Sequence, residues 1–335
     1  MNSNIKVYRI FFVLFFLYNL SLTSCDTAAS TTEASKLKAS VDNIVKDSIS
    51  LEEEEQLELA PDEAFSYQLN EPDATFKMPN KLKEISGLGI NEAGTYLYAI
   101  QDEEGDLFMI NTSTGEVEEE INFHKDGDYE GVECAAGRIF IVKSSGTLYE
   151  VKNLGTDNQE LIKNKFTFNK NSDVEGLGYD PIENRLLISC KGKAGKGDEY
   201  EFKKGIFSLD MDSMQLDLNP VYTISVEEVK SFLEVNNTLE KIDKLIKLFQ
   251  PGEEFIFGPS GIAVHPRTND IYIISSVGKV IVVLNRLGKI KHIIKLKKKI
   301  HQQPEGIAFD QDGTLYIANE GKDDKGKIYK FAYLP

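Results

Sequence analysis

The chain has 335 residues, of which 38 are Lys or Arg and 54 are Asp or Glu, and its formal charge is −16 at pH 7. A protein surface this negative repels phosphate backbones, so the composition argues against a nucleic-acid-binding function. The hydrophobic fraction of 41%, with 10% aromatic residues, is sufficient for a packed core and excludes a chain that is disordered throughout.

Residues 1–24 have the features of a signal peptide. Lys6 and Arg9 precede the apolar run Ile10–Tyr18, which is shorter than the roughly 20 apolar residues of a membrane-spanning helix. The segment Leu22–Cys25 is similar to a bacterial lipobox. We therefore predict a lipoprotein of the cell envelope, attached to a membrane through lipidated Cys25 and facing the periplasm or the cell surface. The alternative is an ordinary secretory signal with a chance cysteine.

Residues 25–62 are predicted to form a disordered tether rich in acidic residues, Ser and Thr. The segment Asp26–Ser35 is of low complexity, and Glu52–Glu55 is a block of like charge. Segments of this composition stay solvated because they cannot bury enough apolar surface. The tether would hold the folded part of the chain, residues 63–335, away from the membrane.

An internal repeat organises residues 63–335. Each copy opens with an acidic residue or Ser, followed by Gly and an aliphatic residue, and continues with short strands rich in β-branched and aromatic side chains. The residues before the glycine lie at positions 86, 130, 175, 260 and 305. Four short strands repeated every 40–50 residues or so are typical of propeller blades, and we predict an all-β propeller. A regular β-sandwich would explain the strand spacing but not the recurring motif.

We predict five four-stranded blades rather than six. The long interval between the third and fourth copies lacks the motif and contains a polar insertion, 191–204, and a short helical insertion near 226–249 that opens on the capping box Ser225–Glu228. The last copy ends after Phe331 without an outer strand. We predict that an N-terminal strand, Phe65–Leu69, supplies it and closes the last blade, because closure hides strand edges that promote aggregation.

The ordered series of motifs resembles the SdiA-regulated family of bacterial proteins, which is distantly similar to NHL-repeat propellers. The segments that carry the resemblance are Glu84–Ile110, Asp128–Val151, Asp173–Lys193 and Gln303–Phe331. Each motif is short, but together they span nearly all of residues 65–335. The resemblance implies a five-bladed propeller with a bound calcium ion, and it defines no biochemical activity.

The repeat predicts a metal site at one rim of the central channel. The residue before each repeat glycine opens the innermost strand of its blade, so Glu130, Glu175 and Glu305 should lie around one axis, with Ser86 and Ser260 at the equivalent positions. Carboxylates gathered in this way repel one another when partly desolvated. Ca²⁺ accepts about six to eight oxygen ligands, whereas zinc prefers His and Cys. We therefore predict that these five residues bind Ca²⁺.

An alternative to the metal site is left open by the sequence. Each glutamate could instead accept backbone hydrogen bonds or pair with a lysine such as Lys191. Acids in loops near the same rim are second-tier candidate ligands, although a solvated turn residue is the stronger interpretation for each: Asp102, Glu103, Asp128, Asp173 and Glu320.

Two functions are compatible with such a ring. The favoured one is a non-enzymatic module that binds an unknown protein or small-molecule ligand at the rim, with calcium in a structural role. The alternative is a calcium-dependent hydrolase of lactonase or esterase type, in which the metal polarises a carbonyl or activates water and Glu130 or Asp102 acts as the base. The chain has no Gly-x-Ser-x-Gly motif, which argues against a serine nucleophile.

Overall fold

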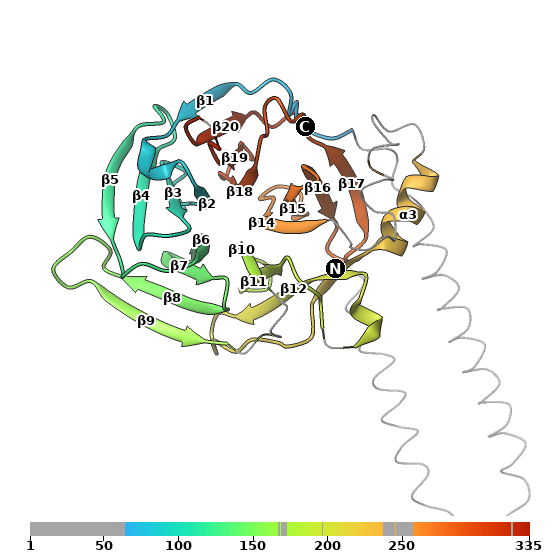
Figure 1. Ribbon diagram of the computed structural model, residues 1–335, viewed down its shortest axis with the longest axis horizontal. Helices are drawn as coiled ribbons and strands as arrows, with labels where there is room; N and C mark the ends of the chain where they lie inside the picture. Colours follow the sequence, from blue (N-terminus) through green and yellow to red (C-terminus); the bar gives the residue numbers. More distant parts are fainter. Residues whose placement is uncertain are drawn as a thin grey trace, which may run out of the picture. The chain divides into compact units, whose positions relative to one another are not determined.

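The computed structural model describes residues 64–335 except 167, 169–172, 196, 237–244, 246–256 and 323. The predicted signal peptide, Cys25 and the tether lie outside these residues. The described strands form five four-stranded antiparallel sheets. These sheets are the blades of a propeller, with β2, β6, β10, β14 and β18 innermost (Figure 1). The predicted all-β architecture and the number of blades are confirmed.

In blades 1 to 4 the strands run outward from the innermost strand in chain order, and in blade 5 the first three do so. Blade 1 consists of β2 (Ile85–Ile90), β3 (Tyr96–Gln101), β4 (Asp106–Asn111) and β5 (Val117–Asn122). Blade 2 consists of β6 (Tyr129–Ala135), β7 (Arg138–Lys143), β8 (Thr147–Lys152) and β9 (Glu160–Lys165). Blade 3 consists of β10 (Val174–Asp180), β11 (Arg185–Cys190), β12 (Lys203–Asp210) and β13 (Tyr222–Ser225).

The last two blades follow the same plan. Blade 4 consists of β14 (Gly258–Val264), β15 (Ile271–Val277), β16 (Val280–Leu284) and β17 (Ile290–Lys295). Blade 5 consists of β18 (Pro304–Phe309), β19 (Leu315–Asn319), β20 (Lys327–Phe331) and, as its outermost strand, β1 (Ala74–Lys77). Two short 3-10 helices, η1 (Asn80–Leu82) and η2 (Asp198–Tyr200), lie in the connecting loops.

An N-terminal strand closes the last blade, as predicted, but its position was predicted wrongly. The strand that pairs with β20 is β1, with Phe76 opposite Ile328, and not the segment Phe65–Leu69. In that segment the Tyr67 hydroxyl donates a hydrogen bond to the Gly313 carbonyl at 2.6 Å. The apolar alternation of Phe65–Leu69 thus reflects burial of its aromatic side chains against blades 4 and 5, not strand pairing.

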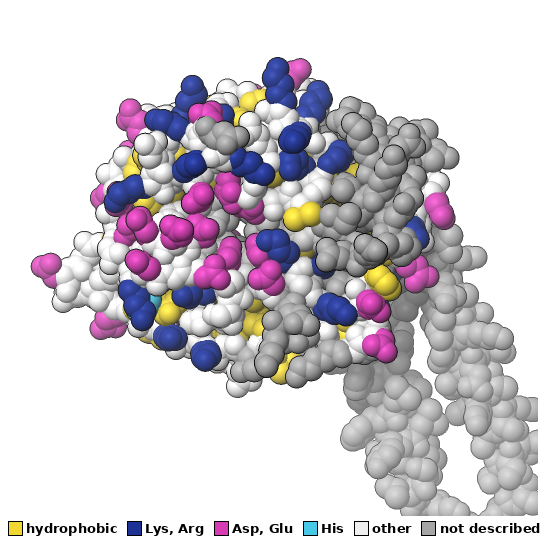
Figure 2. Space-filling view, in the orientation of Figure 1, with side chains coloured by type: hydrophobic (Ala, Val, Ile, Leu, Met, Phe, Trp, Pro, Cys, Tyr) yellow, Lys and Arg dark blue, Asp and Glu magenta, His cyan; other side chains and the backbone are white. Residues whose placement is uncertain are grey.

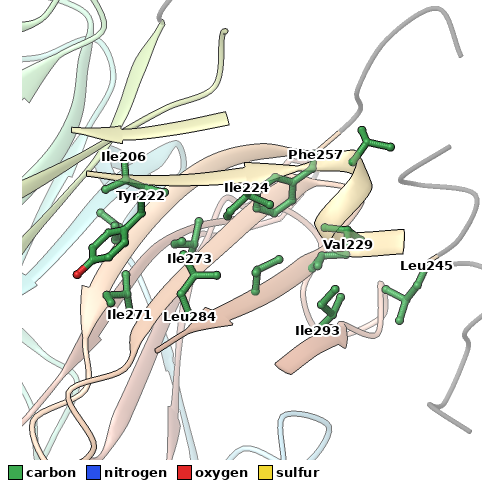
Figure 3. Close-up of a cluster of buried hydrophobic side chains, with 14 of the residues drawn as sticks. Ile206, Tyr222, Ile224, Val229, Leu245, Phe257, Ile271, Ile273, Leu284 and Ile293 are labelled. Atoms are coloured by element: carbon green, nitrogen blue, oxygen red, sulfur yellow. The ribbon is translucent and has the colours of Figure 1, made fainter. Parts of the chain in front are cut away.

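The core lies between the blades, because neighbouring sheets pack face to face. Among the described residues, five hydrophobic clusters are each shared by two adjacent blades. Figure 3 shows the one between blades 3 and 4, where Ile206 and Ile224 face Ile271 and Ile273. Each fully buried aliphatic side chain of this kind contributes about 1.5–3 kcal/mol. Packing of this type explains why the central strands are apolar on both faces.

The predicted helical insertion contains α3 (Val226–Val235). Its N-terminus is the predicted capping box: the Ser225 side chain accepts a hydrogen bond from the Glu228 N–H, and the Glu228 carboxylate accepts one from the Ser225 N–H. Val229 is buried in the cluster between blades 3 and 4. The rest of the predicted insertion lies outside the described residues, apart from Asn236 and Leu245. No helix among the described residues is long and apolar enough to span a bilayer.

Candidate functional site

The innermost strand of every blade carries a β-bulge at the same place in the repeat. In β6, for example, Tyr129 pairs with Lys143 and Gly131 pairs with Val142, so that the intervening residue has no partner on β7. A bulge of this kind changes the direction of the side chain at the extra residue. The bulged residues are the five that the sequence predicts as metal ligands: Ser86, Glu130, Glu175, Ser260 and Glu305.

The repeat glycines allow the innermost strands to approach one another closely. A Cβ on Gly176 would lie 3.0 Å from Gly261 Cα, and a Cβ on Gly261 would lie 2.6 Å from the Glu305 carbonyl oxygen. At the closing interface, a Cβ on Gly306 would lie 2.6 Å from Leu88 Cβ. Contacts this short leave no room for a side chain. The motif therefore encodes both the narrow channel and the bulge beside it.

The three bulged glutamates influence one another electrostatically across the channel. Burial, followed by repulsion from Glu175, raises the pKa of Glu130 to about 9. Burial raises the pKa of Glu305 to about 8, with further contributions from Glu320 and Glu175. Glu130 and Glu305 therefore each lie within electrostatic reach of Glu175, and the three residues come from different blades. A cation at the rim would relieve this repulsion and favour the ionised forms of the three glutamates.

Lys191 compensates part of this charge. Its ammonium lies 2.9 Å from Glu175 Oε1, and burial raises the pKa of Glu175 only to about 7 because Lys191 opposes the increase. Burial disfavours the charged form of Lys191, but Glu175 and Glu305 outweigh this effect and raise the pKa of the lysine. The alternative that the sequence left open, in which a lysine pairs with a rim glutamate, therefore applies to Glu175.

The two bulged serines connect neighbouring blades. The Ser86 hydroxyl donates to the Tyr129 carbonyl at 2.8 Å, and the Ser260 hydroxyl donates to the Pro304 carbonyl at 2.9 Å. Each acceptor immediately precedes a bulged glutamate of the next blade. This role of the serines was not predicted from the sequence, although the 43- and 44-residue separations of donor and acceptor match the repeat.

Acids from the neighbouring loops extend the negative region. Burial, then Glu84, Glu103 and Asp128, raise the pKa of Asp102, and Asp102 Oδ1 is buried without a hydrogen-bond partner among the described residues. Glu84 was not predicted as a site acid. Its repeat position was a usable signal, because Glu84 lies two residues before a bulge, as do Asp128 and Asp173.

The second-tier acids take different partners. Asp128 accepts a hydrogen bond from the Ser144 hydroxyl and contributes to the raised pKa of Glu130. Asp173 accepts the Lys191 N–H through its backbone carbonyl at 2.8 Å. Burial raises the pKa of Glu320, and Asp102 and Glu84 add to the increase. Figure 2 shows a face of the ring on which Asp and Glu side chains gather toward the middle, with Lys and Arg mostly around them.

This arrangement offers hard oxygen donors but no finished coordination shell. In the described part of the chain, no three His, Cys, Asp or Glu side chains form a group that could hold a metal ion. The carboxylates come from separate blades, and one of them already contacts Lys191. Cation binding would therefore require side-chain movement at the rim.

Comparison with known proteins gives a family match and several similar solved structures. The SdiA-regulated family matches residues 67–194 and 218–322. A streptogramin B lyase structure is 11% identical, with a TM-score of 0.40, and the match covers 77% of this chain and 68% of that one. The PQQ-bound aldose sugar dehydrogenase from Streptomyces coelicolor is 10% identical, with a TM-score of 0.47 and coverages of 78% and 97%. A luciferin-regenerating enzyme is 12% identical, with a TM-score of 0.45 and coverages of 79% and 96%. No curated protein matches the chain.

Proposed function

The chain belongs to the SdiA-regulated family, and we propose that it is an exported, membrane-anchored propeller whose channel rim binds Ca²⁺ and serves as a binding module for another molecule. The observation that supports this proposal is that Glu130, Glu175 and Glu305 occupy the same bulge position in three blades, and that Glu130 and Glu305 both interact with Glu175. Burial and mutual repulsion oppose the ionisation of these glutamates. A hard divalent cation would favour their charged forms.

The donor chemistry of the rim fits calcium. The three glutamates would hold the ion, and Asp102 and Asp128 are further oxygen donors nearby. Asp102 Oδ1 is buried without a hydrogen-bond partner among the described residues, so this oxygen is not committed to another contact. When bound, the ion would supply positive charge that neutralises the rim and joins blades 2, 3 and 5.

Calcium is expected to raise the melting temperature of the protein. Ligand at about 100 times its Kd stabilises the folded state by about 2.7 kcal/mol, which corresponds to roughly 5–11 °C in a domain of this size. Replacing both Glu130 and Glu175 by Gln should abolish the shift, because the amides keep the shape of the side chains but lose their charge. Differential scanning calorimetry with and without calcium measures both results.

The matched control removes two acids far from the rim. Glu119 and Glu160 are exposed on the outer strands β5 and β9, so Glu119→Gln with Glu160→Gln makes the same change in net charge. This variant should keep the calcium response of the parent. If calcium leaves the melting temperature of the parent unchanged, the rim is not a calcium site.

Lipid anchoring rests on the sequence around Cys25, and its test is cell fractionation. Cys25→Ser should move the protein from the membrane fraction to the soluble fraction, because the thiol that would carry the lipid is lost. Cys134→Ser, which changes a free thiol within blade 2, should leave the distribution unaltered. Unchanged membrane association of Cys25→Ser would show that another feature holds the protein there.

A calcium-dependent hydrolase is the second candidate, and one observation favours it. Burial, then repulsion from Glu175 and Asp128 and a hydrogen bond with Asp128, raise the pKa of the Glu130 carboxyl to about 9. In this candidate Glu130 would act on the substrate instead of holding the ion, and because it stays protonated at neutral pH it could donate a proton to a leaving group. A panel of lactones, esters and phosphoesters assayed with calcium tests this candidate. Turnover that Glu130→Gln abolishes would favour the enzyme over the binding module.

A further inference from the structure

The rim is not equally acidic in all five blades. Two residues before the bulge, the first three blades have Glu84, Asp128 and Asp173, whereas blade 4 has Gly258. Blade 4 also has a serine at the bulge, Ser260, so it contributes no carboxylate at either position. The ring of acids is therefore interrupted on one side.

Lys191 of blade 3 fills this interruption. A Cβ on Gly258 would lie 2.7 Å from Lys191 Cγ, so glycine at this position provides the space in which the lysine stem lies. The base of the residue is fixed by its backbone, because its N–H donates to the Asp173 carbonyl at 2.8 Å and its carbonyl accepts the Lys204 ammonium at 2.6 Å. The Lys191 side chain is thus directed across the blade interface toward the acidic rim.

The ammonium of Lys191 contacts an oxygen that the proposed ion would need. It lies 2.9 Å from Glu175 Oε1, and the Glu175 side chain is only 8% exposed, which leaves little room for a second cation at the same oxygen. Lys191 also interacts with Glu305, a second proposed ligand. A divalent ion and the Lys191 ammonium bound to the same carboxylate would repel each other strongly in a partly desolvated site.

We propose that Lys191 is a tethered cation that competes with the divalent ion for Glu175 and thereby sets the calcium affinity of the rim. This inference rests on the proposed calcium site. Ion binding displaces the Lys191 ammonium from Glu175, and the ring needs either the lysine or the ion to neutralise that carboxylate. Removing the ammonium while keeping the apolar stem should therefore strengthen calcium binding.

The test is isothermal titration of the full chain with calcium chloride alone. Lys191→Met keeps a stem that packs over Gly258 and should bind calcium at least about tenfold more tightly than the parent, because one repulsive charge is removed. Lys191→Arg keeps the charge and should not bind more tightly. Lys193→Met, which removes an exposed lysine of the same loop, should bind as the parent does.

The outcomes separate this inference from the proposed function. If the parent binds calcium and Lys191→Met binds no more tightly, Lys191 is not a competitor, and the calcium site stands. If neither protein binds, both ideas fail. Binding by Lys191→Met alone would support the competition and show that the lysine replaces the ion in the parent. Should Lys191→Met not fold, Gly258→Ala, which displaces the lysine stem, must also tighten calcium binding, and unchanged affinity would overturn the inference.

Discussion

Replacing Gly261 by Ala is expected to lower the melting temperature by about 6–12 °C. The added Cβ would lie 2.6 Å from the Glu305 carbonyl oxygen and 3.0 Å from the Ile274 side chain. The first of these atoms is backbone of the next innermost strand and can move only if the blades separate. Because the opposing atom is backbone and cannot rotate away, the cost should lie at the upper end of the usual range for overpacking, about 3 kcal/mol, and each kcal/mol lowers the melting temperature of a domain of this size by roughly 2–4 °C.

Gly137→Ala is the control for this variant. Gly137 lies in the hairpin between β6 and β7, where an added Cβ meets nothing within 4 Å but the backbone has φ of +70°. Its replacement measures the cost of left-handed backbone alone, about 1–2 kcal/mol. Thermal unfolding of the two variants and the parent gives the comparison. A melting temperature of Gly261→Ala within 2 °C or so of the parent would mean that the innermost strands are not in close contact.

The blade architecture could be predicted because the sequence contains an internal repeat with one copy for each blade. Each copy has the same order of bulge residue, glycine and strands, and a ring is the arrangement that buries both faces of every blade. The closing strand could not be assigned as reliably. Both Phe65–Leu69 and β1 have alternating apolar residues, and the choice between them depends on long-range contacts such as the Tyr67 hydroxyl with Gly313.

The candidate site was predictable only where it follows the repeat. The positions of Glu130, Glu175 and Glu305 recur in the sequence, so their convergence could be expected. The position of the Lys191 side chain could not be predicted, because it depends on the space that glycine leaves at position 258 in a different blade. A contact that occurs between only one pair of blades, such as Lys191 over Gly258, leaves no periodic signal.

The folded protein is expected to lose stability as the pH rises from 7 to 9 in the absence of calcium. The pKa is raised from 4.5 to about 7 in Glu175, about 8 in Glu305 and about 9 in Glu130, first by burial in each case. In this range the unfolded glutamates are already ionised, whereas the folded ones still hold protons. The folded state therefore binds more protons than the unfolded state, and stability falls as the pH rises through the folded pKa values.

Titration of His265 and His301 does not contribute to the change in stability between pH 7 and 9. Burial lowers the pKa of His265 and of His301 to about 4, so both are neutral above pH 7 in the folded and in the unfolded state. Their contribution is lost only as the pH falls below the unfolded value of about 6.5. Each proton held only by the folded state changes the free energy of unfolding by up to about 1.4 kcal/mol per pH unit. Urea unfolding at pH 7, 8 and 9 measures the slope.

Calcium should flatten this slope, because carboxylates that bind the ion are ionised in the folded state and release no further protons. Glu133 provides the internal control. Burial raises its pKa to about 8, but its carboxylate accepts the N–H groups of Cys134 and Tyr179 instead of lying in the calcium site. Glu133→Gln should therefore reduce the slope without altering the effect of calcium, whereas Glu130→Gln should reduce both. A stability that stays constant or rises between pH 7 and 9 would contradict the coupling of the rim carboxylates.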